Sequence, residues 1–105
     1  MNSFKENLER MPAIDDLSGL ALLDDQGNII DIIENKPGKQ GSLRVYRHLA
    51  DKYGAINPQA AEEGIALFAE HTEAARSHPG SHPNIDRLLD LISSGSSLQV
   101  RLLAA

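Results

Sequence analysis

The chain has 105 residues, a length typical of one domain, and a formal net charge of −5 at pH 7. Its 41% hydrophobic and 24% charged residues predict a globular protein rather than a disordered one. It has no cysteine, which excludes disulfides, thiolate nucleophiles and cysteine-ligated zinc. The negative charge argues against general nucleic-acid binding, and the apolar runs are far shorter than the roughly 20 residues of a membrane span. The N-terminus lacks the apolar region of a signal peptide, so we expect a cytoplasmic protein.

Hydrophobic periodicity and capping residues predict four helices. Ser3 and Glu6 have the spacing of a capping box, so a first helix is expected to begin there and to end at Pro12. Gly54 and Gly95 have the position of residues that end helices. The other three helices are expected at 43–53 with Ser42 as N-cap, from 58 to near 77, and from 83 or 84 to 93.

Three segments have the pattern of strands. Residues 20–23 and 29–33 flank a loop in which Gly27 suits a left-handed position, which predicts a β-hairpin. Residues 98–102 alternate apolar and polar side chains, as a half-buried strand does. We therefore expect a single α+β domain over residues 1–105, in the order α-β-β-α-α-α-β. Its small three-stranded antiparallel or mixed sheet, made by the hairpin and the C-terminal strand, would be packed by about four helices.

One basic segment stands out in this acidic chain, because residues 34–54 carry five basic and two acidic groups. It contains the stretch NKPGKQGSLRVY, in which a glycine-rich loop leads into a helix N-terminus, where free N–H groups favour anions. A nucleotide-hydrolysing P-loop is excluded, because its lysine follows the second glycine and here the lysine precedes it. The simpler alternative is a Pro-Gly turn before a capped helix. The expected ligand-binding residues are Lys36, Gly38, Lys39, Gly41, Ser42, Arg44 and Arg47.

A second candidate site consists of three histidines in the C-terminal half. His71 and His78 are seven residues apart, two turns along one helix face, and a Pro-Gly turn would fold His82 back toward them. Three imidazoles suit zinc or another first-row metal, which would fit a metal-dependent hydrolase. The spacing matches no known metal motif, so exposed turns and a packed imidazole are the alternative reading. No GxSxG motif or readable Ser-His-Asp arrangement indicates an enzyme.

The segments NKPGKQGSLRVY, EEGIALFAEHTEAAR and HPNIDRLLDL together resemble a family of short, uncharacterised bacterial proteins classed as a domain of unknown function. The resemblance covers most of the chain, from the hairpin to the last helix. It implies a bacterial cytoplasmic protein, and it transfers no catalytic or binding residue.

Three functional hypotheses follow from these patterns. The first is a non-enzymatic binding or interaction module without a cofactor, which binds an anionic small molecule or an acidic protein surface on the basic loop and helix. The second is a metal-binding protein centred on the three histidines. The third is a homodimer or adaptor whose apolar contact surface, on the open face of the sheet, includes Ile29, Ile33 and Leu103.

Overall fold

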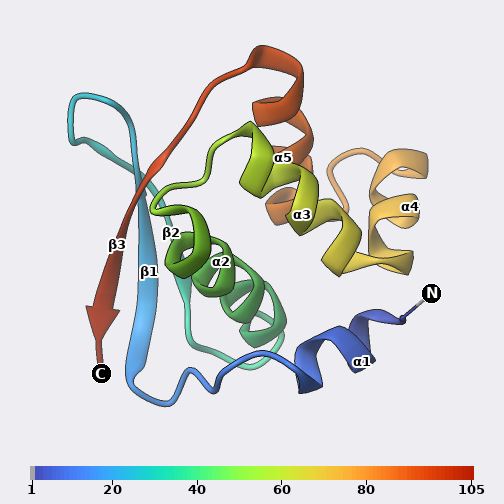
Figure 1. Cartoon of the computed structure of the whole chain (residues 1–105), viewed down its shortest axis with the longest axis horizontal. Helices are drawn as coiled ribbons and strands as arrows, with labels where there is room; N and C mark the ends of the chain where they lie inside the picture. Colours follow the sequence, from blue (N-terminus) through green and yellow to red (C-terminus); the bar gives the residue numbers. More distant parts are fainter. Residues whose placement is uncertain (1) are drawn as a thin grey trace.

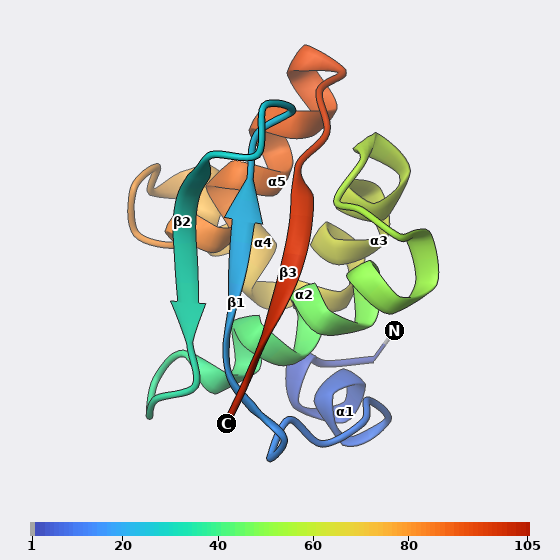
Figure 2. The same ribbon diagram turned by 90° about the vertical axis from the view of Figure 1, so that its left-hand side faces the viewer.

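A computed structural model describes residues 2–105 as a three-stranded antiparallel sheet with helices on one of its faces (Figure 1). Seen from the other side of the sheet, the strands face the viewer and the helices lie behind them (Figure 2). This arrangement confirms the α+β class. No helix in residues 2–105 is both long and apolar enough to cross a membrane. The elements are α1 Phe4–Glu9, β1 Leu17–Leu23, β2 Ile29–Glu34, α2 Gln40–Tyr53, α3 Pro58–Phe68, α4 Glu70–Ser77, α5 Pro83–Ser94 and β3 Gln99–Ala104.

The strand order is β2-β1-β3, so the first hairpin strand lies in the middle and the C-terminal strand pairs with its other edge. Both pairings are antiparallel, and Leu20 of β1 lies opposite Ile33 of β2 and Leu102 of β3. The hairpin loop is as predicted, because Gly27 has a φ of 85° and the Asp24 carboxylate accepts two backbone N–H bonds of 2.9 Å. The capping box of Ser3 and Glu6 is also present.

One of the three residues predicted to form an apolar patch on the open sheet face does not lie there. Ile33 is only 2% exposed, because it shares the helix-covered face with its buried cross-strand partner Leu20. Leu103 is half-buried. The exposed isoleucines of β2 are Ile29, Ile30 and Ile32. Self-association through this strand stays a prediction, which light scattering over a range of concentrations would test.

Helix α2 lies across the inner face of the sheet and supplies much of the core. The side chains of Leu43, Tyr46 and Leu49 are fully buried. Helices α3 and α5 pack closely, because a Cβ atom added at Gly64 would stand 2.7 Å from a methyl group of Leu88. A larger residue at this position would therefore force the Leu88 side chain to move.

The third predicted helix is in fact two helices, α3 and α4, which meet at Ala69. Ala69 has a φ of 51°, a value uncommon for a residue other than glycine. The break leaves carbonyl groups at the end of α3 without helical partners. The Thr72 hydroxyl donates to the Ile65 carbonyl at 2.6 Å, and the Asn7 amide donates to the Leu67 carbonyl at 2.8 Å. Asn7 and Thr72 are the buried polar residues of the described chain, so their burial is explained by this break.

Candidate functional site

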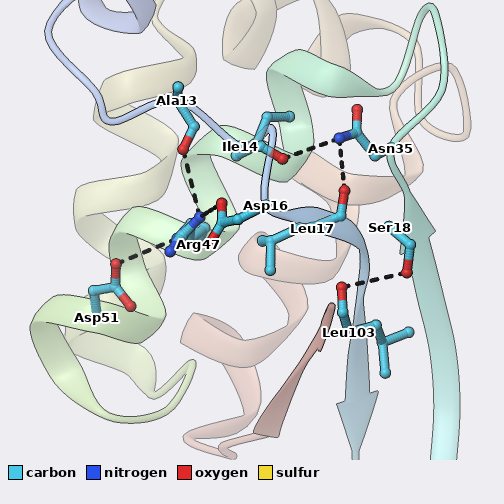
Figure 3. Close-up of polar contacts among 9 residues, drawn as sticks. All are labelled: Ala13, Ile14, Asp16, Leu17, Ser18, Asn35, Arg47, Asp51 and Leu103. Atoms are coloured by element: carbon cyan, nitrogen blue, oxygen red, sulfur yellow. Dashed lines mark hydrogen bonds and ion pairs between the residues drawn. The ribbon is translucent and has the colours of Figure 1, made fainter. Parts of the chain in front are cut away.

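The loop between β2 and α2 is a tight turn with fixed ends. The Lys39 N–H donates to the Lys36 carbonyl at 2.9 Å, and Gly38 has a φ of 86°, as the third residue of a type II turn requires. The Asn35 side chain donates to two backbone carbonyls next to β1, at 3.1 and 2.8 Å (Figure 3). It also accepts a 3.0 Å bond from the Gln40 side chain. These bonds hold the start of α2 in one position beside the sheet.

Helix α2 begins at Gln40, three residues earlier than predicted, so the expected N-cap role of Ser42 is wrong. The N-cap is Lys39, whose side chain makes no capping bond and whose carbonyl accepts from the Leu43 N–H at 3.1 Å. No protein acceptor in residues 2–105 bonds to the N–H groups of Gln40, Gly41 and Ser42. Three amides at the positive end of a 14-residue helix are therefore free to bind an anion.

This helix end opens into a pocket of about 800 Å³. The pocket is lined by residues of α1, β2, the N-terminal part of α2, the last residue of α3, α4, and the first turn of α5 with the loop before it. It brings together most of one predicted site and part of the other, although about 30 residues separate them in the sequence. The predicted site residues that line it are Gly38, Lys39, Gly41, Ser42, Arg44, His71 and His82.

Aromatic rings form one side of the pocket. The ring centroid of Phe4 lies 5.2 Å from that of Phe68 in a stacked arrangement, and 4.9 Å from that of His71 in an edge-to-face arrangement. The His71 and His82 centroids are 5.6 Å apart. A Cβ atom added at Gly41 would stand 3.0 Å from the tip of the Phe4 ring. Gly41 is therefore a glycine that lets α1 rest on the first turn of α2.

The charges in the pocket are mainly positive. No carboxylate in the described part of the chain forms an ion pair with Lys39 or Arg44. Arg44 donates only to the Leu8 carbonyl, at 3.3 Å. The carboxylate that lines the pocket, Asp31, is paired with Arg87 of α5. A chain of net charge −5 thus has a pocket in which the cations Lys39 and Arg44 form no ion pair with the described residues.

A buried tyrosine fixes the far wall of the pocket. The Tyr46 hydroxyl donates to the Asn84 carbonyl at 2.5 Å and accepts from Arg87 at 3.3 Å. Arg87 also donates to the Asn84 side chain at 2.9 Å. Burial raises the pKa of Tyr46 to about 12, although the nearby Arg87 charge acts in the opposite direction. These bonds tie the start of α5 to α2 and to the Asp31 strand.

Two predicted ligand-binding residues lie outside the pocket. Lys36 pairs with Glu34 at 2.5 Å. Arg47 points to the segment before β1, where it pairs with Asp16 at 2.5 Å and lies 3.6 Å from Asp51 (Figure 3). The hydrogen bond from Arg47 lowers the pKa of Asp16. Both cations are neutralised within the chain, so we remove them from the candidate site.

The three predicted metal ligands are not brought together. His78 ends α4, where its N–H donates to the Ala74 carbonyl and its own carbonyl accepts from Ser81. Among the residues that the structure describes, no group of three or more His, Asp or Glu side chains is placed to hold a metal ion. His71 and His82 remain as neighbouring rings in the pocket.

A separate polar cluster joins α2 to α3 and accounts for the fourth histidine. The Glu63 carboxylate accepts from Lys52 at 2.6 Å and Tyr53 at 2.8 Å, and lies 2.7 Å from a ring nitrogen of His48. Burial acts to raise the pKa of Glu63, but these hydrogen bonds outweigh it and lower the pKa to about 2. This cluster stabilises the contact of two helices and lies apart from the pocket.

The sequence-based predictions missed the apolar part of the pocket. Phe4, Leu8 and Phe68 lie at helical spacing with other apolar residues, and such a pattern predicts core positions. Their contacts to α2 and α4 cross many residues of sequence, so no local signal identifies them as pocket residues.

The fold and the pocket together define a class of protein, namely a small α+β domain with helices on one sheet face and a basic pocket where several helix ends meet. A family model described as "Uncharacterized protein conserved in bacteria (DUF2322)" matches residues 4–102, and the chain belongs to this family. The match extends from α1 into β3 and confirms the resemblance of the three sequence segments. No curated protein and no solved structure matches the chain.

Proposed function

We propose that this protein binds a small anionic ligand in the pocket at the N-terminus of α2. The observation that carries the proposal is the convergence of three free helix amides with two unpaired cations, Lys39 and Arg44, in one concavity. Backbone N–H groups at a helix start donate hydrogen bonds to an anion, and the helix dipole adds favourable potential. Gln40 is exposed, and Gly41 and Ser42 are half-buried.

The shape of the site favours a small molecule over an acidic protein surface. A volume of about 800 Å³ falls within the roughly 300–1,000 Å³ typical of small-molecule pockets. Acidic protein surfaces are met by exposed basic faces, whereas Arg47 on the outer part of α2 is already neutralised by Asp16.

Binding without catalysis fits the residues of the pocket best. Ser42 and Ser81 line it, but no hydrogen bond joins either hydroxyl to His71 or His82 in the described chain, as an activated nucleophile would require. For the metal-dependent alternative, residues 2–105 contain no cluster of three or more His, Asp or Glu side chains that could hold a metal ion.

The test is an amide NMR titration with phosphate and pyrophosphate, at fixed ionic strength and against chloride. We expect saturable shifts of the amides of residues 38–44 and of Ser81, His82, Asn84 and Ile85. Lys39→Ala should weaken phosphate binding about two- to fivefold, since an exposed charge contributes modestly. Lys36→Ala is the matched control and should leave the affinity unchanged, because Lys36 is paired with Glu34 outside the pocket. Shifts no larger than those of other exposed loops would refute the proposal.

A further inference from the structure

We infer that the anionic group of the ligand is attached to an aromatic ring, which packs against the aromatic side of the same pocket. This inference rests on the proposed function, because it names the chemical class of the ligand for that site. It concerns phosphates and carboxylates alike, since both anions accept hydrogen bonds from helix amides.

The first argument is size. A bare phosphate or carboxylate occupies only the region around a few amides, whereas the pocket encloses about 800 Å³. Pockets in this range typically bind a molecule with a substantial body and use a few polar groups to orient it. The ligand therefore needs a body as well as a charged group.

The second argument is the chemistry of the side that would contact this body. Phe4, Leu8, Phe68 and His71 line the same pocket as the basic groups Lys39 and Arg44. Phe4 and His71 are only half-buried, so parts of their rings remain accessible. Aromatic rings favour other rings at centroid distances of about 4.5–7 Å, in stacked or edge-to-face arrangements. The ring pairs already present have centroid distances of 4.9, 5.2 and 5.6 Å, which lie within this range. An aromatic ligand ring could pack beside them in the same way.

The third argument is that the two sides of the pocket adjoin. The tip of the Phe4 ring lies 3.0 Å from where a Cβ atom on Gly41 would stand, and the Gly41 amide is one of the three free N–H groups. An anion on these amides therefore has an aromatic surface directly beside it. A phenyl group joined to the anion through at most one carbon would reach that surface while the charge stays on the helix end.

The experiment compares small probes by the same NMR titration: methyl phosphate, phenyl phosphate, phenylacetate and the uncharged benzyl alcohol. We expect phenyl phosphate to bind at least tenfold more tightly than methyl phosphate, with benzyl alcohol weaker than both. Phenylacetate separates the two head groups, because its binding relative to phenyl phosphate shows which anion the site prefers. Equal affinities for methyl and phenyl phosphate would overturn the inference but leave the proposed function intact. Benzyl alcohol as tight as phenyl phosphate, or no binding of any anion, would overturn both.

A substitution assigns the effect to the aromatic side. Phe4→Leu should remove most of the gain of phenyl over methyl phosphate. Tyr53→Leu is the control, since this aromatic residue lies outside the pocket and should leave the gain unaltered. If Phe4→Leu does not fold, intermolecular NOEs in the unmodified protein decide: contacts from the phenyl protons to Phe4 and His71 support the inference, and contacts elsewhere overturn it.

Discussion

The imidazole rings of His71 and His82 lie with their centroids 5.6 Å apart at the edge of the pocket. One belongs to α4 and the other directly precedes α5, so the Pro-Gly turn between them does fold the chain back. Both rings line the same pocket as the cations Lys39 and Arg44. The fold therefore brings part of the predicted histidine site to the basic loop and helix.

Replacing Ala69 with glycine should relieve the backbone strain at this position. A residue other than glycine with positive φ is strained, so Ala69→Gly is expected to raise the free energy of unfolding by about 1 kcal/mol. Ala66→Gly, on an exposed position of α3, is the control and should lower it by about 1 kcal/mol. Urea denaturation midpoints measure both. Equal losses in the two variants would mean that Ala69 is unstrained.

The Glu63 cluster predicts a specific acid sensitivity. Its pKa in the folded protein, about 2, is below the ordinary value for a glutamate, so the carboxylate stabilises the fold fully above about pH 4.5. This contribution is lost as the pH falls from 4.5 to 2. Glu63→Gln should therefore be less stable than the unmodified protein at pH 6 and should lose less stability on acidification. Glu62→Gln, the neighbouring exposed glutamate, should keep the original pH profile.

The raised pKa of Tyr46 predicts how the stability of the fold changes at alkaline pH. Its folded pKa of about 12 lies above the unfolded value near 10, so its contribution is complete below pH 10 and is lost between pH 10 and 12. Ultraviolet titration should show one tyrosine that ionises only near the onset of unfolding. Tyr46→Phe should cost about 1–3 kcal/mol at pH 7, because it removes a buried hydrogen bond to the start of α5. A tyrosine spectrum that titrates entirely near pH 10 in folded protein would contradict this.

Several features were determined by the sequence alone, because their hydrogen bonds close within a few residues. The capping box of Ser3 and Glu6, the hairpin loop with Gly27 and the turn at Gly38 each satisfy local backbone groups with nearby atoms. Apolar periodicity likewise located most of the helices, and with these elements it predicted the α+β class.

Other features were decided only by tertiary contacts. No proline or glycine stands at the helix break at Ala69 to predict it from the sequence. The carbonyl groups that the break frees accept hydrogen bonds from Asn7, about 60 residues away, and from Thr72. The strand order depends on β3 pairing with β1 from the far end of the chain. Apolar periodicity indicates that one face of a helix or strand is buried, but not which element packs against it. Neither the helix break nor the strand order can therefore be predicted from local sequence.

The composition of the pocket shows the same division. The sequence identified a basic segment, but it could not separate Lys39 and Arg44, which stay unpaired, from Lys36 and Arg47, which meet carboxylates. It also identified His71 and His82 without relating them to that segment. Charged side chains form ion pairs with opposite charges that lie close to them in space. Only the tertiary structure determines those distances. The sequence therefore identified the basic and histidine residues of the candidate site. The packing of α1, α4 and the start of α5 against the first turn of α2 brings them together.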